Sequence, residues 1–225
     1  MTAKRGPRRG RPPKGAPQLN RDAIVAATLK VIDLDGIDAV SMRAVAAVLG
    51  VDPKSLYNHV AGKDGLLDAV AEQILGSMRL PEPTGDVRTD LPAIGHAFRD
   101  SALAHPRAAP LVLTRQLTSF KALAPVDAVL NVLRAAGFPQ HDAVPILRAL
   151  VATLIGTLLR EVQAGPTYGM TDAPGIAQRQ AVLEQSGLPR LAEAATDLAH
   201  FDRDAEFAFT LDFTLDAVMA RLATR

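Results

Sequence analysis

The spacing of apolar residues along this chain predicts a protein built from helices. Between residues 21 and 35 the apolar positions recur at intervals of three and four, which places them on one side of a helix. Asn20 suits the N-cap of this helix and Gly36 suits its end. The residues expected to face inward are Ile24, Ala27, Thr28, Val31 and Ile32. Strict alternation of apolar and polar residues, which marks half-buried strands, is scarce, and we therefore expect an all-α fold.

Two short helices joined by a tight turn are predicted between residues 41 and 63. Ser41 can cap the first helix, because its hydroxyl can accept a hydrogen bond from one of the free N–H groups at a helix start. Gly50 suits the left-handed residue that ends such a helix. Asp52 can cap the second helix, with Pro53 in its first turn. The residues expected to face inward are Met42, Val45, Val48, Leu49, Leu56 and Val60. This pattern is typical of a helix-turn-helix, whose second helix enters the major groove of DNA.

Polar side chains of the second helix are left on its outer side, where they can donate hydrogen bonds to DNA. We expect Lys54, Ser55 and Asn58 to reach base edges, since lysine suits guanine and asparagine suits adenine. Ser41 lies at a helix N-terminus that favours phosphate, and Arg43 can reach a phosphate or a base. The complete set of expected DNA contacts outside the N-terminal arm is Ser41, Arg43, Lys54, Ser55, Tyr57, Asn58, His59 and Lys63. Two of these have structural alternatives, because Tyr57 can be a half-buried packing residue and His59 can cap the end of its helix.

The rest of the chain has the apolar pattern of longer helices. They are expected near residues 63–79, 88–105, 107–120, 125–137, 144–164, 174–186 and 203–223. Residues 144–162, with Pro145 in the first turn, and the last helix are apolar on more than one side and must be buried on more than one side. No apolar run reaches the length that crosses a bilayer, and no signal peptide is evident. We therefore expect a cytoplasmic protein without a membrane partner.

Charge is distributed unevenly along the chain. Residues 1–21 hold seven of the 25 basic residues and no acid, so the remainder carries 18 basic against 24 acidic residues. We expect residues 1–19 to be a disordered basic arm that binds DNA phosphates. Within this arm Arg9 and Arg11 belong to an Arg-Gly-Arg-Pro sequence that resembles the AT-hook, an element that lies in a narrow A·T minor groove. The alternative is an arm that binds DNA without preference.

These residues together resemble the TetR family of bacterial repressors. The elements that carry the resemblance are Leu-Gly-Val at 49–51, Leu-Tyr at 56–57, His59, Lys63 and Leu-Leu at 66–67. The resemblance is specific over about residues 20–70, and the remainder is more distantly similar to the tetracycline-repressor type of C-terminal domain. It implies phosphate contacts for Tyr57, His59 and Lys63.

The resemblance also implies a domain organisation and partners. Residues 20–66 would form a three-helix DNA-binding domain, and residues 67–225 a larger helical domain for regulation and dimerisation. A homodimer would bind double-stranded DNA at a pseudo-palindromic operator. It would act as a repressor that a small molecule, bound in the C-terminal domain, releases from DNA.

The identity of that small molecule is open from the sequence. The candidates for contact with it are the polar or aromatic residues that interrupt the apolar helices, namely His96, Phe98, Arg115, Gln116, Phe120, Arg160, Glu161 and Gln163. Each is as well explained as a surface residue or a satisfied core residue. The magnesium-chelating histidine pattern of tetracycline repressors is not evident, and we expect neither a metal nor a cofactor.

An enzyme is not expected, because the five histidines lack a metal-ligand spacing and neither a G-x-S-x-G sequence nor a phosphate-binding glycine loop is found. A non-inducible architectural protein that uses its basic arm to coat or bend DNA is the alternative function. An enclosed cavity of several hundred cubic ångströms in the C-terminal domain would favour a ligand sensor over that alternative.

Deletion of residues 1–18 is expected to lower the affinity for DNA and the steepness of its salt dependence. Each lost phosphate contact should reduce the slope of log K against log salt by about 0.9. Binding measured over a series of salt concentrations checks this expectation. An unchanged slope would mean that the arm does not contact phosphates.

Overall fold

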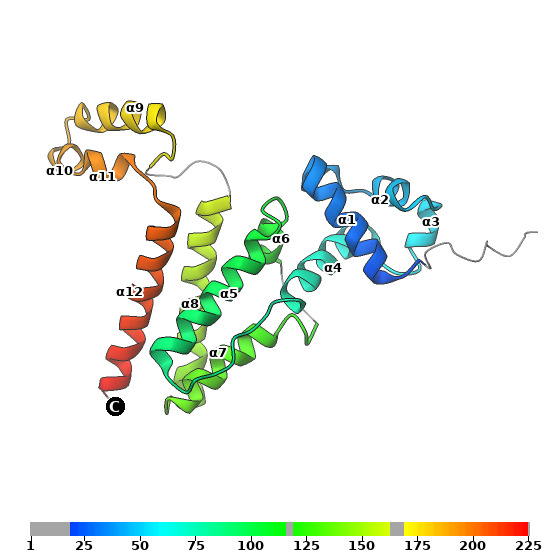
Figure 1. Ribbon diagram of the computed structural model, residues 1–225, viewed down its shortest axis with the longest axis horizontal. Helices are drawn as coiled ribbons and strands as arrows, with labels where there is room; N and C mark the ends of the chain where they lie inside the picture. The colour runs from blue at the N-terminus through cyan, green and yellow to red at the C-terminus, as the bar shows by residue number, and fades with distance from the viewer. Residues whose placement is uncertain (1–18, 116–118, 163–168, 225) are drawn as a thin grey trace, which may run out of the picture.

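The expected all-α fold is confirmed by the computed structural model, which describes residues 19–115, 119–162 and 169–224 (Figure 1). The expected arm at residues 1–19 lies, apart from Leu19, outside the described residues, as do Arg9, Arg11, Gln116 and Gln163. The described helices are α1 (Arg21–Asp35), the 3₁₀ helix η1 (Ile37–Ala39), α2 (Met42–Leu49), α3 (Pro53–Leu56), α4 (Gly62–Gly76), α5 (Val87–Leu103), α6 (Ala109–Thr114), α7 (Ala124–Ala135), α8 (Gln140–Val162), α9 (Ala173–Glu184), α10 (Pro189–Glu193), α11 (Ala195–Ala199) and α12 (Arg203–Ala223). Within these residues the extended pairing is limited to one parallel bridge between Met170 and His200.

The first helix follows the prediction at both ends. The Asn20 side chain accepts a hydrogen bond from the Ala23 N–H at 2.8 Å, and Gly36 ends the helix with φ +87°. All five residues of the predicted inner stripe are buried. This stripe packs against α2 and α4, so the three helices share one apolar core.

The helix α4 joins the N-terminal helices to the rest of the molecule (Figure 1). It packs against α1 on one side and against α5 and α6 on another, and it buries apolar residues that include Leu66, Val70 and Ile74. The apolar core of the N-terminal helices therefore continues through α4 into the C-terminal part. A domain boundary at residues 66–67, which falls inside this continuous helix, stays a prediction.

The C-terminal part is built around the long helices α8 and α12, which pack side by side (Figure 1). A second apolar cluster lies among α5, α7, α8 and α12, with Leu133 and Phe138 at its centre. The helices α9, α10 and α11 pack on one another and form a small lobe beside the start of α12. The short helices α10 and α11 were not expected from the sequence.

Several boundaries and orientations differ from the predictions. Val48 is 43% exposed, because α2 buries the side that carries Met42, Val45 and Ala46. The helix α6 ends at Thr114, earlier than expected, since Arg115 has extended backbone angles. The helix α4 likewise ends at Gly76 and not near residue 79.

The start of α8 also differs from its prediction. The helix begins at Gln140, where the N–H groups of Asp142 and Ala143 donate to the Pro139 carbonyl oxygen at 3.0 and 2.9 Å. Pro145 therefore lies inside the helix and not in its first turn. The helix continues through Arg148 without a break. By length and composition α8 is therefore long and apolar enough to cross a membrane, whereas the sequence was expected to contain no apolar run of that length. Such a helix is weak evidence for a membrane span, since core helices meet the same criteria, and α8 packs against α5, α6, α7 and α12.

The loop between α4 and α5 is held by one buried carboxylate. Asp90 accepts hydrogen bonds from the Thr84 N–H at 2.9 Å, the Thr84 hydroxyl at 2.7 Å and the Gly85 N–H at 3.0 Å. The hydrogen bonds from Thr84, together with that from Gly85, outweigh the effect of burial and lower the pKa of Asp90 below 3.8. This Pro- and Gly-containing loop is thereby an ordered connection and not a flexible linker.

Asp90→Asn is expected to lower the melting temperature at neutral pH, because an amide nitrogen cannot accept the bonds that one carboxylate oxygen receives. The folded-state pKa of Asp90 is depressed, so its contribution to stability is present above the unfolded value near 3.8 and is lost as the pH falls further. The difference in melting temperature between the wild type and the variant should therefore shrink below about pH 3.8. Thermal unfolding from pH 3 to pH 7 measures it, with the exposed Asp100→Asn as the matched control. A difference that stays constant with pH would contradict this role.

Candidate nucleic-acid interface and ligand cavity

The helices α2 and α3 form the predicted helix-turn-helix. The Ser41 hydroxyl accepts from the Ala44 N–H at 3.1 Å, and the Asp52 carboxylate accepts from the Lys54 N–H at 2.8 Å. Gly50 has φ +67°, and its N–H donates to the carbonyl oxygens of the last turn of α2. A residue with a Cβ is strained at this φ, which explains why glycine stands at the turn.

The inner side of this unit is apolar and its outer side is polar. Leu56 and Val60 are buried as predicted, and they pack into the core formed with α1 and α4. The helix α3 ends at Leu56, so Tyr57, Asn58 and His59 lie in the turn that follows and not in the helix itself.

The structure brings the eight predicted DNA contacts to neighbouring elements, with Ser41 and Arg43 at the start of α2, Lys54 to His59 in and after α3, and Lys63 in the first turn of α4. All of them are exposed except Ser55, which is half-buried. Tyr57 is 59% exposed, which leaves its ring and hydroxyl available at the surface. Lys63 donates from Nζ to the Asp38 carbonyl oxygen at 3.3 Å. Exposed donors of this kind can reach phosphates and base edges.

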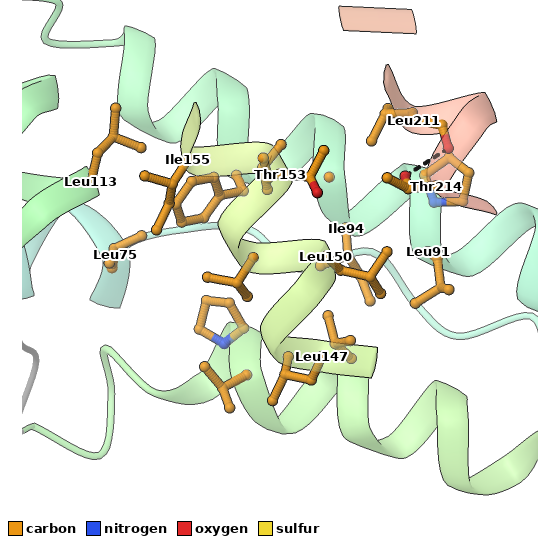
Figure 2. A pocket seen from close by; sticks show the side chains of 18 of the residues that line it. Leu75, Leu91, Ile94, Leu113, Leu147, Leu150, Thr153, Ile155, Leu211 and Thr214 are labelled. Atoms are coloured by element: carbon orange, nitrogen blue, oxygen red, sulfur yellow. Dashed lines mark hydrogen bonds between the residues drawn. The ribbon is translucent and has the colours of Figure 1, made fainter. Parts of the chain in front are cut away.

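A cavity of about 370 Å³ lies in the C-terminal part (Figure 2). Its walls come from α4, α5, α6, α7, α8 and α12, and most of the side chains are aliphatic, such as Leu91, Leu150 and Leu211. Gly95 of α5 allows α12 to come close, because a Cβ at this position would lie 2.8 Å from Cδ2 of Leu211. A pocket of this size and character suits a small apolar molecule.

Few polar groups line the cavity. They are the hydroxyls of Thr153, Thr210 and Thr214 and the guanidinium of Arg115. The threonines could not be assigned to a ligand site from the sequence, because a threonine in an apolar helix is compatible with simple helix packing. Among the described residues, no group of three or more His, Asp or Glu side chains is placed to hold a metal ion.

Of the described residues that the sequence suggested for ligand contact, Phe98 and Arg115 line the cavity, whereas His96, Phe120, Arg160 and Glu161 do not. His96 is exposed and meets the ring of Phe207 edge-on at a centroid distance of 5.2 Å. Phe120 is 92% exposed in the turn before α7. Arg160 pairs with Glu206 at 3.5 Å and lies over a neighbouring aromatic ring.

Arg115 connects the cavity to the helix that leads to the N-terminal domain. It lines the cavity, and its Nη2 donates to Asp64 Oδ1 of α4 at 3.0 Å, while its Nη1 donates to Asp68 one turn further along. Burial disfavours the charge of Arg115, but the hydrogen bonds to Asp68 and Asp64 outweigh it and raise its pKa. The guanidinium is therefore charged and bound to α4.

A second set of contacts joins the same region to α1. The His105 Nδ1 lies 3.2 Å from Asp33 Oδ2, and the Arg107 guanidinium donates to the Leu34 carbonyl oxygen at 2.6 Å. His105 and Arg107 precede α6, and Arg115 follows it. The segment that contains α6 is thus attached to the N-terminal helices at both of its ends.

The outer side of α8 and α12 exposes apolar groups. Phe209 and Phe213 are 68% and 67% exposed, and their rings stack on each other with centroids 6.1 Å apart. On α8 the small residues Ala149, Ala152 and Gly156 are also exposed. The apolar character that the sequence analysis attributed to burial is therefore only partly used within one chain.

Comparison with known proteins agrees with this geometry. Residues 24–70 match the family model of the bacterial regulatory proteins of the tetR family, and residues 80–222 match that of the tetracyclin repressor-like C-terminal domain. An HTH-type transcriptional regulator of Saccharopolyspora erythraea is 35% identical over 85% of this chain and 83% of its own length. The class A tetracycline repressor protein of transposon 1721, from Escherichia coli, is 31% identical over 91% of this chain and 92% of its own.

Solved structures show the same similarity in three dimensions. The apo structure of ActR from Streptomyces coelicolor has a TM-score of 0.80 at 25% identity and covers 92% of this chain and 97% of its own. ActR is also known in complex with actinorhodin, with a TM-score of 0.80 to this chain. Regulators of this family bind operator DNA and small molecules and form dimers, and the matching relatives are transcriptional regulators.

The family matches cover most of the chain, and the exposed helix-turn-helix and the apolar cavity lie in the two parts that they match. The chain therefore belongs to the TetR family of bacterial transcriptional regulators.

Proposed function

We propose that this chain is a sequence-specific repressor that leaves its operator when a small apolar molecule enters the cavity of the C-terminal domain. The observation that carries this proposal is the position of Arg115, which lines the cavity and is bound to two carboxylates of α4. A molecule that displaces this side chain changes its ion pairs with α4, the helix that leads to the DNA-binding unit. We place the protein in the cytoplasm, where operator DNA is found, and assign it no catalytic activity.

The DNA-binding role is supported by the exposed polar side of α2 and α3. Lys54, Ser55 and Asn58 are assigned to base edges, where lysine and asparagine have matching hydrogen-bond patterns. The exposed Tyr57 and His59, together with Lys63, are assigned to phosphates, as are Ser41 and Arg43 at the start of α2. Arg9 and Arg11 of the basic arm are assigned to the adjacent minor groove.

The ligand role is supported by the volume and lining of the cavity. About 370 Å³ of mostly aliphatic space suits a molecule of several rings. ActR, which has a similar fold, is known in complex with actinorhodin, and the TetR protein of Acinetobacter baumannii in complex with minocycline. This cavity favours a ligand sensor over an architectural DNA-binding protein, which has no use for such a space.

The mechanism of release follows from the ion pairs that Arg115 makes with α4. Its two ion pairs fix the first two turns of α4, and Lys63 of the same turn belongs to the DNA-binding surface. A ligand that contacts Arg115, or that moves Val112 and Leu113 of α6, shifts these bonds relative to α4. Because the two DNA-binding units of a dimer must match the spacing of the half-sites, a small shift of α4 is sufficient to weaken binding.

A dimer is supported by the exposed apolar side of α8 and α12. Phe209 and Phe213 expose two stacked rings, and the small residues of α8 allow a second helix to approach closely. We assign this surface to contact with a second copy of the chain. Twofold symmetry then requires a pseudo-palindromic operator.

Selection of bound duplexes from a random pool is expected to recover an inverted repeat. Asn58→Ala should relax the preference at one base position in each half-site, at a cost of about 1–3 kcal/mol. Lys63→Ala should instead weaken binding to all sequences and reduce the salt slope by about 1 per protomer. Recovery of A·T-rich DNA without a repeat would favour the architectural alternative. An unchanged base preference in Asn58→Ala would contradict the base contact assigned to Asn58.

The double variant Asp64→Asn, Asp68→Asn is expected to weaken release by ligand while leaving ligand binding intact, since neither residue lines the cavity. With actinorhodin as the probe, the ratio of operator affinities without and with ligand should fall by at least about fivefold, the lower end of usual coupling strengths. Fluorescence anisotropy with a labelled operator measures this ratio, and actinorhodin binding is measured separately.

The matched control is Arg190→Ala, which removes an exposed charge on α10. An unchanged ratio in the double aspartate variant, with normal actinorhodin binding, would show that release does not pass through Arg115. Failure of actinorhodin to weaken operator binding in the wild type would count against the assignment of the cavity to ligands of this size.

A further inference from the structure

The polar groups of the cavity are concentrated at one of its ends. Thr153 of α8 and Thr214 of α12 lie on adjacent helices near Leu211, while Leu75, Leu113 and Ile155 surround the opposite end (Figure 2). Thr210 lies one turn before Thr214 on α12. A molecule in the cavity therefore meets the threonines at one end wall, and apart from Arg115 the rest of its surface meets hydrocarbon.

The hydroxyl protons of these threonines are already used within their own helices. Thr153 donates from Oγ1 to the Ala149 carbonyl oxygen at 2.9 Å, and Thr210 donates to that of Glu206 at 2.8 Å. Thr214 donates to the Thr210 carbonyl oxygen at 2.8 Å. A hydroxyl has one proton and two lone pairs, so in this arrangement each side chain retains the ability to accept.

Two of the three hydroxyls retain this ability in full. Thr157 is buried, does not line the cavity, and donates to the Thr153 carbonyl oxygen at 3.0 Å and toward Thr210 Oγ1 at 3.4 Å. Thr210 thereby uses part of its accepting capacity inside the protein. The oxygens of Thr153 and Thr214 are left as acceptors for a molecule in the cavity.

The other polar group of the cavity does not alter this end wall. Arg115 follows α6, where it is neutralised by the carboxylates of Asp64 and Asp68. The remaining lining at the threonine end is aliphatic and offers no opposite charge to a charged group placed there. An acceptor placed there, such as an ether or a ketone, would face the threonine lone pairs.

From this arrangement we infer the chemical class of the ligand, an inference that rests on the proposed function. The cavity takes an uncharged, mostly apolar molecule that presents a hydroxyl group to Thr153 and Thr214 and donates its proton to their oxygens. These two threonines set the specificity, and the apolar walls supply most of the affinity through the area that they bury.

Three biphenyls of similar size test this inference, namely 4-hydroxybiphenyl, 4-methoxybiphenyl and 4-methylbiphenyl. The first can donate a hydrogen bond, the second can only accept one, and the third can do neither. In the wild type the hydroxyl compound should bind about 3- to 10-fold more tightly than the other two, as the usual strength of a neutral hydrogen bond gives. Isothermal titration of the full-length protein measures the three dissociation constants.

The double variant Thr153→Val, Thr214→Val should bind all three compounds with similar affinity, because valine keeps the shape and removes the acceptors. Thr153→Ser, Thr214→Ser should restore the preference for the hydroxyl compound. Thr224→Val is the control, since it removes an exposed threonine hydroxyl at the end of α12, outside the cavity, and it should leave the preference unchanged. Thermal unfolding of each variant verifies that it is folded.

Equal affinities in the wild type, a preference for the methoxy compound, or a preference that survives in the double valine variant would each overturn the inference. Lack of binding by all three compounds would overturn it as well, since an apolar cavity of this volume must accept a biphenyl. Operator binding in the presence of 4-hydroxybiphenyl is measured separately. A preference for the hydroxyl compound without any operator release would leave the ligand class standing and count against the proposed ligand-released repressor.

Discussion

The shared burial of α4 is the constraint on which the rest of this structure depends. Its apolar residues pack against α1 on one side and against α5 and α6 on the other, so one helix completes two parts of the core. A helix that is buried on several sides cannot move without repacking its neighbours, because protein interiors are close-packed. The ion pairs of Asp64 and Asp68 with Arg115 add a directional contact at the start of the same helix.

Three of the helices that surround the cavity in the C-terminal part are joined by contacts outside it. Arg99 of α5 donates to Glu161 of α8 at 2.6 Å and to Asp204 of α12 at 2.6 Å, and its guanidinium lies over the ring of Phe207. The hydrogen bonds that Arg99 donates to Glu161 oppose the effect of burial and raise the pKa of Arg99 far above its ordinary value, so this charge is permanent. Such a cluster fixes the relative positions of three helices that line the cavity, and the apolar lining is left for a ligand to cover.

The helix α8 combines two roles on different sides. Leu147, Leu150 and Leu154 line the cavity, while Ala149, Ala152 and Gly156 are exposed beside the aromatic residues of α12. By length and hydropathy α8 resembles a membrane span. Its apolar residues instead line the cavity on one side and form an exposed surface suited to a second chain on the other. Any change in the cavity wall formed by this helix is adjacent to the proposed contact between two copies.

The sequence by itself determined the local structure and the family. Asn20, Ser41, Gly50 and Asp52 act at the helix ends as predicted, because capping depends on residues a few positions apart. The helix-turn-helix was predictable for the same reason, as were most of the long helices.

Only the tertiary structure decided which residues meet at the cavity. Its lining comes from six helices that are distant in sequence, and no short-range pattern indicates that Thr153 and Thr214 share one end wall. His96 and Arg160 interrupt apolar helices as ligand contacts would, yet they lie outside the cavity, because a periodic pattern does not define what packs against each side of a helix. Arg115 joins the cavity to α4 only because the fold places the end of α6 beside Asp64 and Asp68.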